Sequence, residues 1–208
     1  MQRRGPANER GRAKRLDMSS NRVRIIGGHW RSRLVRFAER PGLRPTPDRV
    51  RETLFNWLGQ DLTGRTVLDL YAGSGALGFE AASRGALRVV MVERDPASVR
   101  SLRENCTALA AAQVEVVKAD ALEFLKSERA QFDVIFLDPP FAAAPWSALL
   151  EHLPAHLAAG GMAYCESGVF LDTPAGWALY RQGHAGQVYY ALLKRTAHEP
   201  HRGISGDV

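Results

Sequence analysis

From residue 64 onward, short apolar runs alternate with longer stretches in which apolar residues recur at helical spacing. The short runs have the length and the branched residues of buried strands, and the longer stretches have the period of helices. The predicted strands cover 66–70, 88–93, 114–120, 133–138 and 161–167, and the predicted helices cover 76–84, 96–111, 121–128 and 146–157. This alternation predicts an α/β fold with a mostly parallel sheet covered on both faces, whose ligands bind at the carboxyl ends of the strands.

Hairpin-like segments flank this pattern on both sides. At the C-terminal side, WALYRQ and QVYYALLK flank GHAGQ and predict an antiparallel hairpin that brings the sheet to seven strands. At the N-terminal side, RVRII and RLVRF within 22–37 predict a short, curved hairpin with one apolar face and one face of guanidinium groups. A helix follows within 44–60, where we expect Thr46 as the N-cap, Pro47 as the first helical residue and Gly59 as the end.

Positive charge is concentrated near the N-terminus. Residues 1–51 hold 15 of the 28 Lys and Arg residues and 4 of the 22 Asp and Glu residues, so the rest of the chain is mildly acidic. A basic segment joined to an acidic body is typical of an arm that binds phosphates. Two alternatives stay open: Trp30 stacks on a base or packs on the body, and His29 contacts a phosphate or ends a turn. The candidate nucleic-acid contacts are Arg22, Arg24, His29, Trp30, Arg31 and Arg33.

Several classes of protein are disfavoured. No apolar run approaches the length of a membrane span, and no apolar segment follows the N-terminal charges, so we expect a cytoplasmic protein. Cys106 and Cys165 lack the spacing of a disulfide framework or a zinc site. His152 and His156 stand four apart on a predicted helix but have no third ligand, so no metal site is predicted.

A glycine-rich loop follows the first predicted strand, in LDLYAGSGALGFEAA. Gly73, Gly75 and Gly78 fit Gly-x-Gly-x-x-Gly, which by itself has several meanings. In a dinucleotide site the loop would hold a pyrophosphate and Glu93 would hold a ribose. Asp69, four residues before Gly73, is awkward beside a pyrophosphate but suits a cationic or amine-bearing ligand.

S-adenosylmethionine is a ligand of that kind, because it has a sulfonium charge, an amino-acid tail, a ribose diol, an adenine and no phosphate. Asp69 and the glycine loop would face its methionyl part, Glu93 the diol and Asp120 the adenine amino group. Each acid could instead merely cap a strand or a helix. Acids at the ends of three consecutive predicted strands, beside one glycine loop, favour the cofactor interpretation.

Asp138-Pro139-Pro140-Phe141 ends the fourth predicted strand. An exocyclic amine of a nucleobase is a poor nucleophile, because its lone pair is delocalised into the ring. If Asp138 and the carbonyl of Pro139 each accept one of its hydrogens, the nitrogen can pyramidalise and direct its lone pair at a methyl group. The prolines fix the direction of that carbonyl, and Phe141 offers a face on which an extruded base can stack.

These motifs together resemble a known family. Asp-Pro-Pro-Phe, preceded by VLDLYAGSGALGFEAASRGA, VERD and KADA, is similar to class I S-adenosylmethionine-dependent methyltransferases that act on exocyclic amines. RIIGGHWRSRLV and LRPTPDRVRETLFNWL resemble one branch, the bacterial 16S rRNA (guanine(966)-N2)-methyltransferase family. The resemblance covers residues 22–193 and implies a Rossmann-like class I methyltransferase fold with S-adenosylmethionine as cofactor. It also implies a cytoplasmic monomer that modifies 16S rRNA within the small ribosomal subunit or an assembly intermediate.

The same resemblance implies roles for individual residues. Asp138, Pro139, Pro140 and Phe141 would form the catalytic loop. The cofactor-binding residues would be Asp69, Tyr71, Ala72, Gly73, Ser74, Gly75, Glu93, Arg94, Asp120 and Ala121, with Thr46 and Arg49 where the N-terminal helix meets cofactor and substrate.

The expected chain has a disordered basic tail at 1–20, an RNA-binding hairpin and helix at 21–60, a methyltransferase domain at 61–195 and a flexible tail at 196–208. The expected reaction is methylation of a guanine N2 amine in 16S rRNA. Three alternatives stay open: an adenine-N6 methyltransferase on DNA or RNA, a nicotinamide-dependent oxidoreductase that uses the same glycines, and a ribosome-assembly module that binds RNA without turnover.

Overall fold

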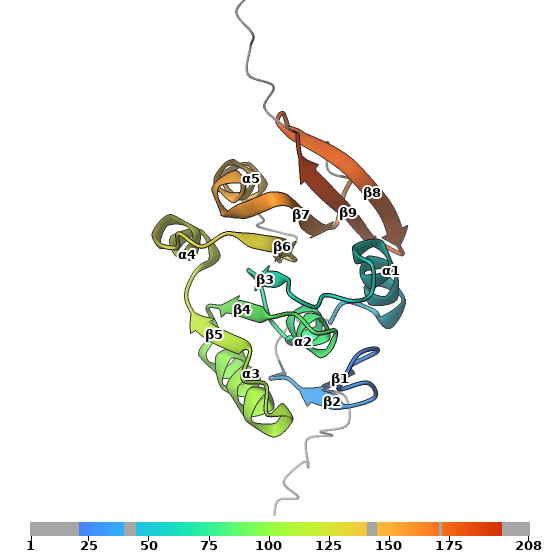
Figure 1. Ribbon diagram of the computed structural model, residues 1–208, viewed down its shortest axis with the longest axis vertical. Helices are drawn as coiled ribbons and strands as arrows, with labels where there is room; N and C mark the ends of the chain where they lie inside the picture. Colours follow the sequence, from blue (N-terminus) through green and yellow to red (C-terminus); the bar gives the residue numbers. More distant parts are fainter. Residues whose placement is uncertain (1–20, 40–44, 141–144, 171, 197–208) are drawn as a thin grey trace, which may run out of the picture.

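The computed structural model describes residues 21–39, 45–140, 145–170 and 172–196 (Figure 1). Within them the main sheet has seven strands in the order β5-β4-β3-β6-β7-β9-β8. Neighbours from β5 to β7 are parallel, and β9 and β8 add an antiparallel hairpin, so the predicted fold class is confirmed. The strands are β3 (Thr66–Asp69), β4 (Arg88–Glu93), β5 (Val114–Lys118), β6 (Phe132–Leu137), β7 (Leu157–Ser167), β8 (Trp177–Ala185) and β9 (Val188–Arg195).

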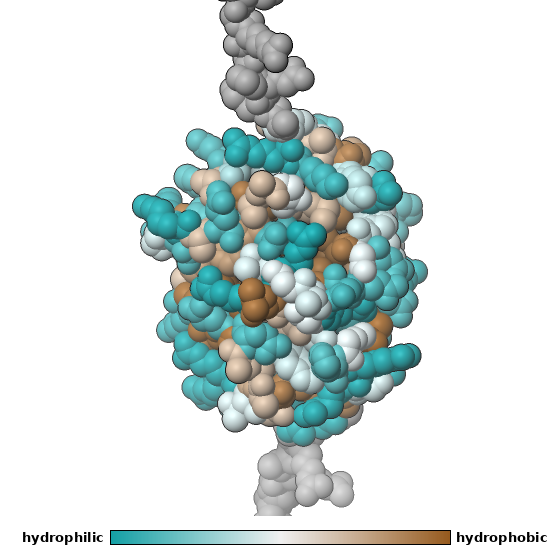
Figure 2. Space-filling view, viewed as in Figure 1, coloured by the Kyte–Doolittle hydropathy of each residue, from teal (hydrophilic) through white to brown (hydrophobic). Residues whose placement is uncertain are grey.

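Helices cover both faces of this sheet (Figure 1). They are α1 (Asp48–Leu58), α2 (Ala76–Ser83), α3 (Pro96–Leu109), α4 (Ala121–Ser127) and α5 (Trp146–His152), with a 3₁₀ helix, η2 (Leu153–His156), after α5. One core cluster contains side chains of α1, α2 and α3, and a second contains side chains of α4 and α5. On the face shown in Figure 2, hydrophilic residues cover most of the surface and hydrophobic residues form small, separate patches. No helix in the described part of the chain is long and apolar enough to span a membrane.

A few element ends differ from the predicted ones. β4 has its predicted bounds, whereas β5 ends at Lys118 because the segment turns there and Asp120 becomes the N-cap of α4. β7 begins earlier than predicted, at Leu157, and pairs with β6 in an irregular register near its start. The predicted helix 146–157 is divided into α5 and η2, because Pro154 has no N–H to donate to an α-helical hydrogen bond.

The N-terminal segment forms a separate two-stranded sheet. β1 (Arg22–Arg24) pairs antiparallel with β2 (Leu34–Arg36), and Val23 stands opposite Val35. Both valines are buried, whereas the arginines of the two strands are exposed. The predicted apolar and guanidinium faces of this hairpin are therefore confirmed.

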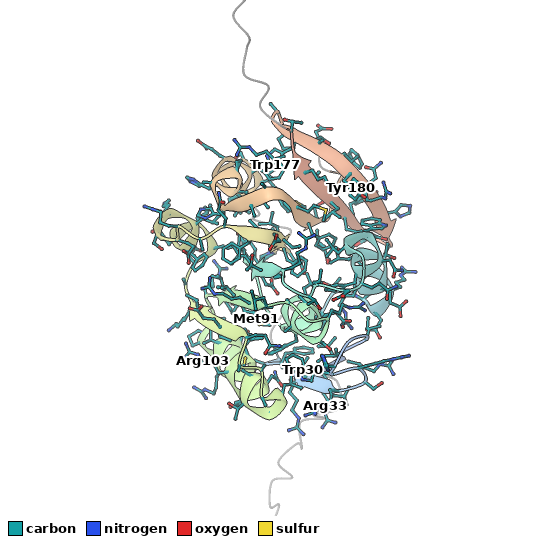
Figure 3. All side chains as sticks on the ribbon, viewed as in Figure 1. Trp30, Arg33, Met91, Arg103, Trp177 and Tyr180 are labelled. Carbon is teal, nitrogen blue, oxygen red and sulfur yellow. The ribbon has the colours of Figure 1, made fainter. Side chains whose placement is uncertain are left out.

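Buried polar groups attach the hairpin to the body. Glu80 of α2 is fully buried and accepts hydrogen bonds from the backbone N–H groups of Ile26 and Gly27 at 2.7 and 2.8 Å. The backbone N–H of Trp30 donates to Ser83 Oγ at 2.8 Å, and the Trp30 ring packs against the core between the hairpin and α2 (Figure 3). The hairpin is therefore docked on the body rather than loosely attached.

Arg51 connects the hairpin, α1 and α2. Its side chain is fully buried, pairs with Glu80 at 3.3 Å and donates to the backbone carbonyl of Arg24 at 2.8 Å. It also donates to the backbone carbonyl of Thr46 at 3.2 Å and to Asp48 at 2.6 Å. Because several guanidinium N–H groups are bonded at once, this buried charge fixes the segment that precedes α1.

The start of α1 differs from the prediction. Pro47 occupies the N-cap position with φ −56° and ψ 147°, and no side chain caps the helix. The expectation that Thr46 is the N-cap is therefore wrong, because its side chain is turned into the body and is 5% exposed. Gly59 does end the helix, in a left-handed conformation with φ 98° that favours glycine.

Candidate active site

Three carboxyl groups lie at the carboxyl ends of adjacent strands. Asp69 ends β3, Asp138 directly follows β6, and Glu166 is the penultimate residue of β7. The sheet order β3-β6-β7 makes these strands neighbours, and Tyr164 of β7 pairs with Phe136 of β6. Side chains two residues apart lie on the same face of a sheet, so continuing this register brings Glu166 beside Asp138.

Burial perturbs the acidity of these groups. Asp69 and Glu166 are each 2% exposed, and burial raises the pKa of each carboxyl to about 7. Burial, and then repulsion from Glu166 and Asp69, raises the pKa of Asp138 well above its usual range. Within the described residues no Lys or Arg forms an ion pair with any of the three. A cationic ligand beside them would therefore stabilise their charged forms.

Thr46 lies beside these carboxyl groups. It lines the pocket together with Asp138, and its hydroxyl acts to lower the pKa of both Asp138 and Glu166 against the larger effect of burial. The hydroxyl of Tyr164 donates a hydrogen bond to Glu166 Oε1 at 2.9 Å. Because Arg51 holds the backbone carbonyl of Thr46, the hydroxyl is kept in place from the other side. The residue expected to cap a helix is instead part of the site.

Backbone N–H groups shape the glycine loop. The N–H of Gly73 donates to Glu93 at 2.9 Å, and the N–H of Gly78 donates to Asp69 at 3.1 Å. Gly75 has φ 79°, and a Cβ there would lie 2.6 Å from an aromatic ring of α2. Glycine is therefore required at position 75 both for the left-handed backbone and for the close approach of loop and helix.

This loop and two of the acids line one pocket, which brings together the end of β3, the residue after β6 and the segment before α1. A buried carboxylate that lacks a cationic partner repels a pyrophosphate and attracts positive charge. The pocket is thus less suited to a dinucleotide than to a cationic ligand. Its lining residues are Pro45, Thr46, Asp69, Tyr71, Ala72, Gly73, Ser74, Ala76, Leu77 and Asp138.

The ends of β4 and β5 lie beside the same pocket. Burial, followed by the negative charge of Asp120, raises the pKa of Tyr71 to about 12, while the nearby Arg94 opposes the shift. Asp120 caps α4 by accepting from two N–H groups of its first turn, and Ala121 begins that helix. Glu93 accepts from two backbone N–H groups. Asp120 therefore caps a helix, whereas Glu93 ties the glycine loop to the segment after β4, and their expected contacts with a cofactor stay predictions.

The predicted catalytic loop is described as far as Pro140. Asp138 lines the pocket, Pro139 is buried and Pro140 is exposed. Phe141 lies outside the described residues, so its expected stacking on a base stays a prediction.

The candidate RNA contacts fall into two groups. Arg24 of β1 lies beside α1, where it forms an ion pair with Asp48 at 3.6 Å. The turn with His29 and Trp30 instead bonds to Ser83 at the C-terminal end of α2, whereas the site lies at the N-terminal end of that helix. Trp30 packs against the core, which is one of the two alternatives that the sequence leaves open for this residue. The exposed arginines of the hairpin and α1 are Arg22, Arg24, Arg31, Arg33, Arg36 and Arg49.

Sequence reasoning misses Glu166 and Tyr164. Glu166 follows the same rule that identified Asp69 and Asp138, because it is an acid at the carboxyl end of a parallel strand, in GMAYCES. The buried pair of Arg51 and Glu80 has no comparable signal, since burial of a charge depends on residues far away in the sequence.

Comparison with known proteins agrees with this geometry. The family model described as "Conserved hypothetical protein 95" matches residues 23–194. Ribosomal RNA small subunit methyltransferase D from Escherichia coli is 42% identical over 183 residues, which cover 86% of this chain and 92% of that protein. The solved structure described as "Putative methyltransferase yhhF from Escherichia coli" is 43% identical, with a TM-score of 0.76, and the match covers 84% of this chain and 98% of that one.

A more distant structure shares the fold alone. The precorrin-6y C5,15-methyltransferase from Geobacter metallireducens is 18% identical with a TM-score of 0.60, and the match covers 77% of this chain and 94% of that one. Fold and site together define a methyltransferase with the Rossmann-like class I fold. More narrowly, the chain belongs to the conserved hypothetical protein 95 family, the family of the ribosomal RNA small subunit methyltransferases D.

Proposed function

We propose that this protein transfers a methyl group from S-adenosylmethionine to the exocyclic N2 amine of a guanine in 16S ribosomal RNA. The observation that carries the proposal is the position of Asp138, which follows β6, precedes Pro139 and lines the same pocket as the glycine loop. Membership of a family whose Escherichia coli relative is named a ribosomal RNA small subunit methyltransferase supports RNA as the substrate.

The charge of the pocket supports the cofactor. When bound, S-adenosylmethionine supplies an electrophilic methyl group on a positively charged sulfur. Asp69 offers to the methionyl part a buried carboxylate with which no Lys or Arg among the described residues pairs, and the glycine loop allows close approach of the backbone. Glu93 would hold the ribose diol and Asp120 the adenine amino group, both from strand ends beside the pocket.

Asp138 and Pro139 act on the substrate amine. Asp138 accepts one hydrogen of the amine and the carbonyl of Pro139 accepts the other, so the nitrogen lone pair is directed at the methyl group. The rigid ring of Pro139 limits the directions that its carbonyl can take. Holding two substrates in this relative orientation makes the step effectively unimolecular. Phe141 would stack on the extruded base.

The N-terminal hairpin and α1 would hold the RNA. β1 carries exposed arginines on the face away from the core, next to α1 and so on the side of the molecule that bears Thr46. Guanidinium groups bind phosphates by forming paired hydrogen bonds. The substrate would be 16S rRNA within the small ribosomal subunit or an assembly intermediate, modified in the cytoplasm by a monomer.

The test is transfer of labelled methyl from S-adenosylmethionine to 30S particles, naked 16S RNA and duplex DNA in parallel, followed by nucleoside analysis. We expect N2-methylguanosine from a ribosomal substrate, and the better of the two substrates identifies the working one. N6-methyladenine as the product would instead identify an adenine methyltransferase. No labelled nucleoside from any substrate would contradict the proposal.

A further inference from the structure

The strands β8 and β9 carry positive charge that no acid balances. They contain Arg181, Lys194 and Arg195 but no Asp or Glu, although the chain after residue 51 is acidic as a whole. Within the described residues, none of these three cations forms an ion pair with a carboxylate. A local excess of positive charge attracts an anionic partner from outside.

A β-bulge brings two of these cations to one tyrosine ring. The register of β8 against β9 shifts between Leu179 and Arg181, so Tyr180 (Figure 3) is an extra residue in β8. In a regular strand, Tyr180 and Arg181 would point to opposite faces of the sheet. Here the guanidinium carbon of Arg181 lies 4.5 Å from the centre of the Tyr180 ring, and Lys194 Nζ lies 3.8 Å from it. The bulge redirects a side chain, so that one ring holds two like charges close together.

These three residues, here named the Tyr180 cluster, lie on the sheet face that packs against α1. Lys194 and Tyr190 are four residues apart on β9, so their side chains point to the same face. The Tyr190 ring lies 5.5 Å from the ring of Trp57 in α1. Tyr180 is 38% exposed, and Arg181 is exposed as well. The cluster is therefore open to solvent beside α1.

The helix α1 lies between the Tyr180 cluster and the N-terminal hairpin (Figure 1). It contacts β1 through the ion pair of Asp48 with Arg24, and it contacts β9 through Trp57. A helix with its side chains is only about 10–12 Å across, so one folded RNA segment can reach cations on both sides of α1. Pro45 and Thr46 of the pocket precede α1, so such a segment would be held beside the pocket.

We propose that Tyr180, Arg181 and Lys194 form a second RNA contact, in which both cations bind one backbone phosphate of the 16S rRNA substrate. The inference rests on the proposed function, because it needs an RNA substrate at the pocket. It gives the C-terminal hairpin a role beyond closing the sheet. Phosphate oxygens accept hydrogen bonds from guanidinium and ammonium groups, so one phosphate binds both cations and offsets their mutual repulsion.

Protection of a sheet edge is the structural alternative. β8 is the last strand in the sheet order, and charged side chains and bulges keep edge strands from pairing with other chains. That role needs exposed charge on β8 only. It needs neither Lys194, which belongs to the inner strand β9, nor a ring that holds two cations together. Removal of the charge should cause self-association if the edge is protected, and loss of RNA affinity if the cluster binds RNA.

The experiment measures binding of the full-length protein to 30S particles from about 50 to about 200 mM salt, a range in which phosphate contacts change affinity strongly. The test variant is the double change Arg181→Gln and Lys194→Gln. The matched control is the double change Arg129→Gln and Arg195→Gln, which removes the same charge at exposed positions. Arg195 directly follows Lys194 and so points to the opposite face of β9, and Arg129 lies before β6.

We expect the test pair to weaken binding roughly fivefold, the scale of exposed charge pairs. The slope of log affinity against log salt should fall by about one, because one phosphate contact is lost, whereas the control pair should keep the wild-type slope. Equal weakening by the two pairs would overturn the inference. Unchanged affinity of the test pair together with self-association in sedimentation would also overturn it, in favour of edge protection.

Two variants test the ring without any change of charge. Tyr180→Leu removes the face that holds the cations and should weaken binding about two- to fivefold, the scale of an exposed cation–π contact, whereas Tyr180→Phe keeps the face and should bind like wild type. Thermal unfolding verifies the fold of each variant. Equal affinities of Tyr180→Leu and wild type would contradict the role of the ring.

Photo-cross-linking from position 180 in the 30S complex identifies the partner. We expect cross-links to 16S rRNA. Cross-links to ribosomal proteins alone would assign this surface to a protein partner and overturn the RNA contact, while the proposed function would stand. Failure of the wild type to methylate any ribosomal substrate would instead refute the proposed function, whatever the salt slopes of the variants.

Discussion

Asp69 illustrates how position alone gives an ordinary side chain an unusual charge state. It ends β3, is 2% exposed and accepts a hydrogen bond from the Gly78 N–H. Burial outweighs these hydrogen bonds and raises its pKa to about 7. Near neutral pH the carboxyl is therefore partly protonated, and a cationic ligand beside it would draw it into the ionised form.

This charge state predicts a pH dependence of cofactor binding. Ionised Asp69 attracts the positive cofactor, so affinity for S-adenosylmethionine should increase as the pH rises through about 7 and then level off. Asp69→Asn should weaken binding roughly tenfold or more at alkaline pH, the scale of a hydrogen bond to a charged group, and should make the pH dependence shallower. Calorimetric titration measures both, with Glu115→Gln as a control at an exposed position near the amino-terminal end of β5, away from the strand ends that line the pocket. Equal affinities of Asp69→Asn and wild type would show that Asp69 does not face the cofactor.

At the residue scale, the sequence predicts the site residues that lie at strand ends. It does not predict the structural role of a residue whose position is set by contacts far away in the sequence. Asp69 and Asp138 are found because parallel strands place their carboxyl ends at one edge. Thr46 is assigned to the site through the resemblance, but local capping preference gives it the wrong structural role. The buried guanidinium of Arg51 holds the backbone carbonyl of Thr46, whose side chain lines the pocket with Asp138, and no local pattern contains that information.

At the scale of elements, α2 connects the pocket with the N-terminal hairpin. Its N-terminal end follows the glycine loop. Its buried Glu80 accepts hydrogen bonds from the hairpin backbone and forms ion pairs with Arg51 and Arg84. The sequence predicts the hairpin and the helices with nearly the observed bounds, because hydrophobic periodicity is a local property. It does not predict that the hairpin docks on α2, because that contact depends on a single acid, Glu80, within an otherwise apolar helix.

Replacement of Glu80 should weaken the contacts of α2 with the hairpin and with α1. Glu80→Ala leaves Arg51 buried without its acidic partner on α2, which should lower the free energy of unfolding by about 3–5 kcal/mol. Chemical denaturation measures the change. Glu115→Ala, which breaks the exposed pair with Arg88 at 2.8 Å, is the matched control and should change the free energy by about 1 kcal/mol or less. Similar losses in the two variants would contradict the anchoring role of Glu80.

At the scale of the whole molecule, charge divides the chain into a basic N-terminal part and an acidic body. The first 51 residues carry 15 of the 28 basic residues, and the exposed arginines of β1 and β2 lie on the face of the hairpin away from the core. The body supplies the acids of the pocket. Such a division suits a protein that attracts a polyanion on one surface and a small cation in a pocket.

RNA affinity should depend on the arginines of β1 more than on arginines elsewhere. The double change Arg22→Gln and Arg24→Gln should weaken binding to 16S RNA and reduce the slope of log affinity against log salt by about one to two, because about two phosphate contacts are lost. The control is the pair Arg65→Gln and Arg129→Gln, which are exposed and lie just before β3 and β6, near the amino-terminal ends of these strands. Equal weakening by both pairs would show that binding follows net charge and not the hairpin.

The most direct test of the proposed function is the rate of methyl transfer to 30S particles by wild type and Asp138→Ala, measured together with cofactor affinity and followed by nucleoside analysis. We predict N2-methylguanosine from the wild type, and a loss of roughly a hundredfold or more in turnover for Asp138→Ala, because the acceptor of a hydrogen bond made in the transition state is removed. The affinity for S-adenosylmethionine should change little. Similar turnover by the two proteins would contradict the role of Asp138, and a product other than N2-methylguanosine would contradict the proposed reaction.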